Sequence, residues 1–433
     1  MSDNALAGSS GTPASGELRR RLGVFDAVLI GLGSMIGAGI FAALGPAARA
    51  AGSGLLIGLA VAALVAYCNA TSSARLAALY PASGGTYVYG RKRLGDFWGY
   101  LAGWGFVVGK TASCAAMALT VGSYVWPAQA HGVAVAAVVA LTTVNYFGVE
   151  KSAWLTRLIV ALVLSVLAAV VVAALTSGTG AFDQLDVGAD ATFGGVLQAA
   201  GLLFFAFAGY ARVATLGEEV RDPARTIPRA IPLALAITLV IYAIVAVVAL
   251  EVLGPGRLAQ AAAPLADTVK VAGVRWLVPV VQVGAAVAAV GSLLALLLGV
   301  SRTTLAMARD RHLPHQLAAV HEQFKVPHRA ELLIGITVAV LAATVDVRGA
   351  IGFSSFAVLI YYAVANASAF TLRREEGRPA RLISVGGVIG CVVLAFALPM
   401  RSVIAGAAIL VLGIAVYGLR RVVAAHRNSQ TSR

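Results

Sequence analysis

Residues 31–41 read Gly31-Leu32-Gly33-Ser34-Met35-Ile36-Gly37-Ala38-Gly39-Ile40-Phe41. They lie inside an apolar run from about residue 22 to residue 44, which is long enough to cross a bilayer because a spanning helix needs roughly 20 apolar residues. Glycine inside a helix costs roughly 1 kcal/mol relative to alanine, so this helix either packs tightly against a neighbour or unwinds. Unwound backbone at membrane depth exposes N–H and C=O groups that only protein or a water-filled cavity can satisfy. Residues 37–39 are therefore a candidate binding site made of backbone atoms.

The composition is that of an integral membrane protein. Of the 433 residues, 59% are hydrophobic and 12% are charged, and the mean hydropathy is +0.87. A soluble domain carries roughly 25% charged residues. Apolar runs near the length of a spanning helix recur along the whole chain, whereas a membrane β-barrel has short alternating segments. We therefore predict an all-α integral membrane protein.

The net charge of +14 reports membrane topology. The spans predicted below place 25 of the 33 Lys and Arg residues on one side of the membrane, 6 on the other side and 2 within spans. Loops rich in Lys and Arg face the cytoplasm. We therefore expect a multi-pass protein of the plasma membrane with both termini cytoplasmic, and no nucleic-acid partner for the basic surface.

Twelve transmembrane helices are predicted from the apolar runs. The three cysteines all fall within these runs and have no metal or disulfide spacing, which indicates small core residues. The predicted spans lie near residues 24–46, 54–79, 97–126, 130–148, 152–176, 192–217, 228–253, 275–307, 330–346, 350–371, 382–399 and 402–422.

The sixth span carries a second interruption, Phe204-Phe205-Ala206-Phe207-Ala208-Gly209-Tyr210-Ala211-Arg212. A charge at the bilayer centre costs at least ~2.5 kcal/mol on insertion scales, so such an arginine normally faces a cavity or a partner. Interrupted spans five apart indicate an inverted-repeat transporter that holds its substrate between the two broken helices. The chain then divides into a disordered cytoplasmic tail (1–21), two five-helix repeats (22–176 and 177–375), helices 11 and 12 (376–423) and a basic cytoplasmic tail (424–433).

Five motifs, taken in order along the chain, resemble those of the amino acid–polyamine–organocation (APC) transporters. Within that superfamily the chain is similar to the bacterial relatives of cationic amino acid transporters. The resemblance covers about residues 22–375 and implies the leucine-transporter-type five-plus-five inverted repeat with discontinuous helices 1 and 6, followed by two further helices. The motifs are Gly33-Ser34-Met35-Ile36-Gly37-Ala38-Gly39-Ile40-Phe41, Pro81-x-x-Gly84-Gly85-x-Tyr87, Phe205-Ala206-Phe207-Ala208-Gly209, Glu218-Glu219-x-x-Asp222-Pro223-x-x-Thr226-Ile227-Pro228 and Ser301-Arg302-x-x-x-Ala306-Met307-Ala308-Arg309-Asp310.

The resemblance also implies how an amino acid substrate is held. Its carboxylate would meet free N–H groups around Ala38 and Gly39, helped by the positive end of the second half-helix. Its ammonium would meet the carbonyl group of Met35 in the first break and carbonyl groups of the second break. These backbone contacts fit any amino acid and leave specificity to the side-chain pocket. The second-break carbonyl groups are those of Phe205, Ala206 and Ala208.

Two aromatic side chains, Phe205 and Phe207, are candidates for gates over the bound molecule. The alternative for both is an ordinary place in the helix core. The complete set of candidate substrate-binding residues is Met35, Ile36, Gly37, Ala38, Gly39, Phe205, Ala206, Phe207, Ala208 and Gly209.

Three positions depart from the pattern of the family. The lysine that proton-moving relatives often carry in span five falls near Val163. The acidic position used by some antiporters of cationic substrates is Ala211, and the serine common in the glycine motif is Ala38. The coupling charge must therefore lie elsewhere, if the protein has one.

Five charged residues are candidates for coupling or gating. Lys110 lies about 13 residues into the third span, so we favour a coupling function over a lysine whose ammonium reaches the membrane surface. Arg212 can form an ion pair or touch substrate, and Glu218 and Glu219 suit a cytoplasmic gate. Asp26 either stabilises the start of the first helix through the helix dipole or belongs to the same gate.

The sequence points to a secondary active transporter, proton-coupled or exchanging, that moves an amino acid by alternating access. No nucleophile–base arrangement, phosphate loop or metal cluster indicates an enzyme, and we expect no cofactor. Two mid-span cations without an obvious carboxylate favour neutral substrates. A cationic amino acid or polyamine antiporter and a non-transporting membrane sensor of amino acids are the alternatives, and the oligomeric state is left open.

Overall fold

The computed structural model describes residues 22–81, 84–148, 153–180, 182–188, 191–214 and 220–431. Within these ranges the regular structure is helical, apart from one isolated parallel bridge between Leu22 and Val220. The predicted N-terminal tail and the predicted gate residues Glu218 and Glu219 lie outside the described residues.

In the described residues of the first half of the chain, an interrupted helix is followed by several continuous ones. The elements are α1 (Val24–Met35), α2 (Ala38–Ala42), α3 (Leu44–Ala51), η1 (Gly52–Gly54), α4 (Leu55–Leu79), α5 (Thr86–Leu94), α6 (Asp96–Val125), η2 (Pro127–Gln129), α7 (Ala130–Tyr146), α8 (Ala153–Thr176) and η3 (Phe182–Leu185).

The second half begins with another interrupted helix and ends in a long one. The elements are α9 (Phe193–Phe207), η4 (Ala208–Tyr210), α10 (Ala211–Ala214), α11 (Pro223–Gln260), α12 (Pro264–Val271), η5 (Arg275–Leu277), α13 (Val278–Arg309), η6 (His315–Ala318), α14 (His328–Thr344), α15 (Val347–Phe370), α16 (Arg381–Ala397) and α17 (Met400–Thr431).

Ten helices of the described residues are long and apolar enough to cross a membrane. Two further predicted spans correspond to α14 and α16, each of 17 residues. At 1.5 Å per residue these reach about 26 Å, somewhat less than the roughly 30 Å hydrocarbon core. The protein is therefore a helical multi-pass membrane protein, while the count of twelve and the two five-helix repeats stay predictions.

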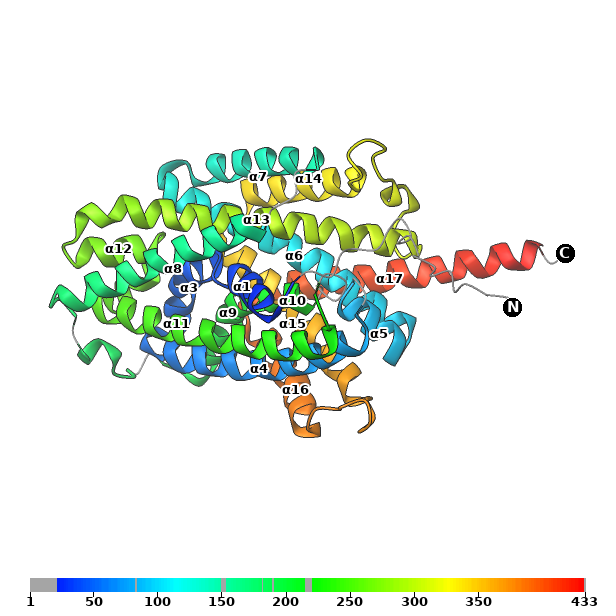
Figure 1. Cartoon of the computed structure of the whole chain (residues 1–433), viewed down its shortest axis with the longest axis horizontal. Helices are drawn as coiled ribbons and strands as arrows, with labels where there is room; N and C mark the ends of the chain where they lie inside the picture. The colour runs from blue at the N-terminus through cyan, green and yellow to red at the C-terminus, as the bar shows by residue number, and fades with distance from the viewer. Residues whose placement is uncertain are drawn as a thin grey trace, which may run out of the picture.

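The interrupted α1 lies in the middle of the helix assembly (Figure 1), where it packs against α8, α11 and α13. At one edge of the view α7 and α14 run side by side, and α16 lies at the opposite edge beside α15. Large apolar side chains such as Leu64, Ile336 and Val411 are exposed on outer helices. A bilayer covers such residues, so the centre of the assembly is left for residues with another task.

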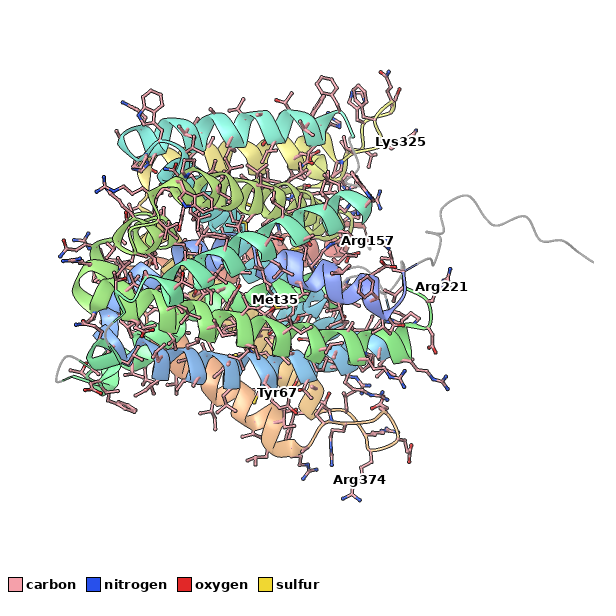
Figure 2. The ribbon with its side chains drawn as sticks, turned by 60° about the vertical axis from the view of Figure 1, so that its left-hand side comes forward. Met35, Tyr67, Arg157, Arg221, Lys325 and Arg374 are labelled. Atoms are coloured by element: carbon pink, nitrogen blue, oxygen red, sulfur yellow. The ribbon has the colours of Figure 1, made fainter. Side chains whose placement is uncertain are left out.

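The helices approach one another closely because small residues fill their interfaces. Ala62, Ala66 and Ala199 are fully buried, and a Cβ atom built on Gly58 would lie 3.1 Å from the Cβ of Ala199. This is the packing expected inside a bilayer, where dispersion contacts replace the hydrophobic effect between helices. Figure 2 shows Met35 near the middle of the assembly, with Arg157 and Arg221 toward one end.

Candidate functional site

The first break separates α1 from α2. α1 ends at Met35 and α2 begins at Ala38, with Ile36 and Gly37 outside helical geometry. Gly37 has φ −90° and ψ −132°, and residues 35–39 are all buried. The predicted unwinding of the glycine stretch is thus present, and it leaves the N-terminal N–H groups of α2 inside the protein.

The second break separates α9 from α10. The α-helix ends at Phe207, and a 3₁₀ turn from Ala208 to Tyr210 connects it to α10. A 3₁₀ turn in mid-helix changes the hydrogen-bond pattern and frees carbonyl groups for other donors. Ala208 and Tyr210 are buried, so those donors must come from the protein or from a ligand.

The two breaks touch each other through glycine. A Cβ atom built on Gly39 would lie 2.6 Å from the Cα of Ala206, and one built on Gly209 would collide with the carbonyl of Ser34. Only glycine allows such an approach of two backbones. The structure therefore brings together both predicted sets of site residues, although they are about 170 positions apart in the sequence.

Tyr242 joins the two breaks, and sequence reasoning missed it. This fully buried side chain of α11 has its hydroxyl within hydrogen-bond reach of the carbonyls of Met35 and Ala206, the latter at 3.1 Å. Its ring packs on Phe207 with centroids 5.2 Å apart. The available signal was a tyrosine in a mostly apolar span, because a buried tyrosine hydroxyl normally finds a partner.

Lys110 reaches the second break from α6. Its Nζ donates to the carbonyl of Ala208 at 3.1 Å, and its side chain is only 6% exposed. The hydroxyl of Tyr362 on α15 lies 3.4 Å from the same carbonyl oxygen. In the part of the chain that the structure describes, Lys110 has no carboxylate within salt-bridge distance. Lys110 is therefore a buried cation whose ammonium is held at the second break by a backbone carbonyl.

The remaining candidate charges are separated. Asp26 in the first turn of α1 forms an ion pair with Arg157 of α8. The pair therefore connects α1 with α8, whereas the gate predicted from the sequence consists of Glu218 and Glu219. Arg212 is half-buried on α10, and its predicted glutamate partners lie outside the described residues. Val163, where relatives carry a lysine, is buried on α8.

The two candidate aromatic gates occupy different surroundings. Phe207 is fully buried against Tyr242, while Phe205 is 7% exposed on the same helix. Phe207 therefore packs on the side chain that links the two breaks. Its gating function, like that of Phe205, stays a prediction.

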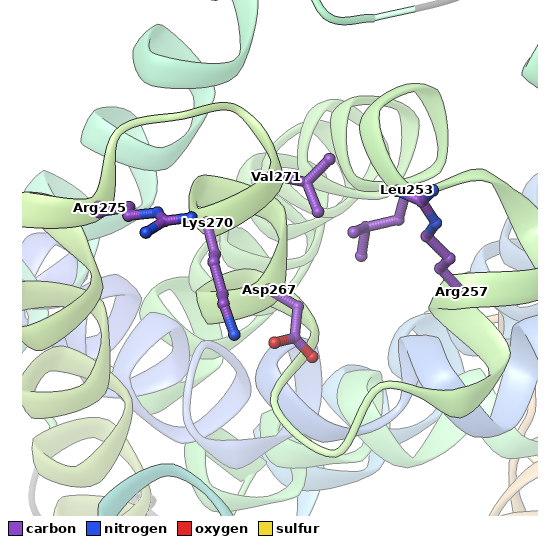
Figure 3. Close-up of a pocket in the computed structure, with 6 residues that line it drawn as sticks. All are labelled: Leu253, Arg257, Asp267, Lys270, Val271 and Arg275. Atoms are coloured by element: carbon purple, nitrogen blue, oxygen red, sulfur yellow. The ribbon is translucent and has the colours of Figure 1, made fainter.

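Two cavities lie near the predicted outer ends of the helices. The first has a volume of about 250 Å³ and is lined by α2, α3, α6, the end of α11 with the link that follows it, and the start of α15. The second has a volume of about 360 Å³ and is lined by residues 253–275 only (Figure 3). The first cavity is lined in part by Ala42, the last residue of α2, the short helix that begins at the first break.

The described residues contain no cluster of side chains suited to metal binding or thiol chemistry. No group of three or more His, Cys, Asp or Glu side chains there could hold a metal ion. Cys68, Cys114 and Cys391 are buried free thiols, and Cys391 donates to the side-chain oxygen of Asn69 at 3.2 Å.

Two broken membrane helices whose breaks touch, with a buried cation beside one of them, are typical of a secondary transporter. The family model described as "Amino acid permease" matches residues 22–418. The chain belongs to this family of amino acid permeases in the APC superfamily, as the five motifs predicted.

The relatives include both near and distant transporters. An uncharacterized transporter of Mycobacterium tuberculosis is 78% identical over 407 residues, which cover 94% of this chain and 92% of that protein. The branched-chain amino acid permease BcaP of Bacillus subtilis is 28% identical over 88% of this chain and 86% of its own length. Human cationic amino acid transporter 4 is 29% identical over 84% of this chain and 61% of its own length.

Proposed function

We propose that the protein carries an amino acid across the plasma membrane by alternating access, and that it holds the substrate between the two breaks. The observation that carries this proposal is the direct contact of Gly39 with Ala206 and of Gly209 with Ser34. Membership of the amino acid permeases supports an amino acid as the substrate.

The backbone of the breaks offers groups for both ends of a zwitterion. Free N–H groups at the start of α2 suit the carboxylate, because a helix N-terminus attracts negative charge. The carbonyls of Met35, Ala206 and Ala208 suit the ammonium, and here they accept from Tyr242 and Lys110. An arriving ammonium therefore replaces donors that the protein itself supplies, which limits the cost of an empty site.

The charge of Lys110 favours a neutral amino acid as the substrate. Two like charges 4 Å apart repel by about 4 kcal/mol at the effective dielectric constant of ~20 typical of protein sites. A lysine or arginine substrate would bring a side-chain cation in addition to its α-ammonium, and Lys110 has no carboxylate within salt-bridge distance among the described residues to offset it. The name of the relative BcaP, a branched-chain amino acid permease, agrees with this preference.

Lys110 also supplies the group that would couple transport to protons. Its ammonium is buried and contacts the carbonyl that the substrate ammonium would use, so binding of one disfavours the other. Loss of a proton from Lys110 would remove this competition, since neutral amine and ammonium differ in hydrogen bonding and charge. Release of this proton when the substrate binds would link the movement of substrate directly to the movement of protons.

Uptake into proteoliposomes tests substrate and coupling together. The purified full-length protein should take up radiolabelled leucine or alanine and leave arginine outside. Uptake should be faster when the liposome interior is more acidic than the outside, because the entering substrate is exchanged for the proton of Lys110. Lys110→Met should abolish the effect of the gradient while counterflow exchange persists. Lys92→Met is the matched control, because Lys92 lies over the ring of Tyr80 and away from the breaks.

Two results would contradict the proposed transport of neutral amino acids, and a third would contradict only the coupling through Lys110. Uptake of arginine without uptake of a neutral amino acid would favour the cationic antiporter. Binding of an amino acid without any flux or exchange would favour a membrane sensor. A response of Lys110→Met to the pH gradient equal to that of the wild type would remove Lys110 from coupling and leave transport itself standing.

A further inference from the structure

The 250 Å³ cavity beside α2 carries more positive than negative charge. Its charged lining residues are Arg49 of α3, Arg348 of α15 and Asp346 just before α15. A side-chain oxygen of Asp346 already accepts from the amide of Gly349 as the N-cap of α15. Two guanidinium groups therefore face one carboxylate that is partly used elsewhere.

The protein fixes both guanidinium groups in place. Nε and Nη2 of Arg49 donate to the carbonyl of Ala259 at 3.2 and 2.9 Å. Nη2 of Arg348 lies 3.4 Å from the side-chain oxygen of Gln198, while its buried Nε has no hydrogen-bond partner. Both groups line the same cavity, so two positive charges share one small space. Like charges held together in this way are relieved by an anion.

The α11–α12 region shapes this cavity. α11 bends at Gly254, which has φ +67°, and the segment after the bend brings Ala259 to Arg49. A left-handed conformation of this kind favours glycine. The cavity volume is a little below the roughly 300 Å³ at which pockets begin to hold drug-sized ligands, so it suits a smaller molecule.

We propose that this cavity is an outer waiting site, in which Arg49 and Arg348 bind the carboxylate of an amino acid before it moves to the breaks. The inference rests on the proposed transport function and adds a site to it. Guanidinium groups suit this task because their planar donors match the two oxygens of a carboxylate. The positive lining also repels cationic solutes, which adds to the selection made by Lys110.

A cysteine in the cavity tests its electrostatics without any need for transport. Ala262 lines the cavity and is exposed, and all three native cysteines are buried. In Ala262→Cys, an anionic methanethiosulfonate should react several times faster than a cationic one, and leucine should slow both reactions. Adding Arg348→Gln should remove the charge preference, while adding Arg275→Gln in the other cavity should leave it.

Uptake by intact cells gives the second measurement. Arg348→Gln should raise the KM for the neutral substrate about tenfold with little change in the maximal rate, and Arg348→Lys should restore part of the loss. Arg275→Gln, which removes the same charge from the 360 Å³ cavity, should leave KM unchanged. The inference fails if both reagents react equally, or if Arg348→Gln and Arg275→Gln change KM alike. Absence of uptake by the wild type would instead contradict the proposed function, and the cysteine reactions would still decide on the cavity.

Discussion

Tyr242 shows how a single side chain can join two broken helices. Its hydroxyl lies between the carbonyls of Met35 and Ala206, each at the edge of a broken helix. Carbonyl groups buried without a donor cost roughly 1–3 kcal/mol each. Tyr242 therefore stabilises the two breaks when no substrate ammonium is present.

We predict that Tyr242→Phe destabilises the empty protein and strengthens the stabilisation by substrate. The free energy of unfolding of the empty protein should fall by about 1–3 kcal/mol, because the ring packing is kept and only the hydrogen-bond donor is removed. The measurement is the melting temperature in detergent with and without leucine. Leucine should raise the melting temperature of Tyr242→Phe more than that of the wild type. In the variant, only the ammonium of leucine can satisfy the carbonyls that Tyr242 contacts.

Tyr100→Phe is the matched control for that experiment. Tyr100 is also fully buried and donates to one carbonyl, that of Gly413, at 3.0 Å, but it lies away from the breaks. It should lower the melting temperature without changing the shift that leucine produces. Equal leucine shifts in the wild type and in Tyr242→Phe would show that Tyr242 and the substrate do not share carbonyls.

At the scale of the elements, the ion pair of Asp26 with Arg157 joins the first half-helix to α8. Figure 2 places Arg157 at the end of the assembly where Arg221 also lies. The amide of Arg221 donates to the carbonyl of Leu22 at 2.9 Å, so α1 is attached there at two points. These attachments must loosen if α1 moves when the predicted cytoplasmic gate opens.

We predict that Asp26→Asn changes the rate of transport more than the stability. Partly exposed ion pairs contribute roughly 0.2–1 kcal/mol, which corresponds to a change of up to about fivefold in a rate or population. Initial uptake rates and melting temperatures in the same preparation separate the two effects. The charge exchange Asp26→Arg with Arg157→Asp should bring the rate back toward the wild type, and its failure to do so would argue against a gating pair.

At the scale of the whole molecule, a polar cluster joins three distant parts of the chain at one face. The Tyr87 hydroxyl donates to Asp310 at 2.6 Å and lies 2.8 Å from Nδ1 of His312. Arg91 also forms an ion pair with Asp310 at 2.5 Å. The cluster connects α5 with the end of α13, and His312 contacts the ring of Tyr417 on α17.

Burial lowers the pKa of His312 below its ordinary value of 6.5, and the nearby Arg91 lowers it further. Asp310 acts in the opposite direction but does not cancel these effects. The folded protein therefore keeps His312 neutral at a pH where the unfolded chain already binds a proton. Stability that is fully present above pH 6.5 is lost as the pH falls toward the lowered pKa of the folded state.

We predict that the melting temperature falls between pH 7.5 and pH 5.5, and that His312→Asn reduces this fall. Asparagine keeps a hydrogen-bonding side chain but cannot titrate. His131→Asn is the control. His131 lies at the start of α7 and contacts the carbonyl of Ala342 near the end of α14, so it does not belong to the cluster of Tyr87 and Asp310. Identical pH profiles for the wild type and His312→Asn would exclude this residue as the source.

The sequence predicted the helices and their interruptions because these depend on properties within one segment. Each predicted span overlaps a helix of the structure, and the glycine stretch does end α1 at Met35. Hydropathy fixes which segments enter a bilayer, and glycine weakens a helix wherever it stands. The same local pattern, read as motifs, was sufficient to identify the family of amino acid permeases.

The partners of the site residues depend on packing between distant segments, which local patterns do not contain. Lys110 was a candidate from its place in a span, but its contact with Ala208 crosses 98 positions of the chain. The link from Tyr242 to Met35 crosses 207 positions, and the contact of Arg49 with the carbonyl of Ala259 crosses 210. Depth in the membrane can be estimated from one helix, whereas direction toward a neighbour follows from how all the helices pack together.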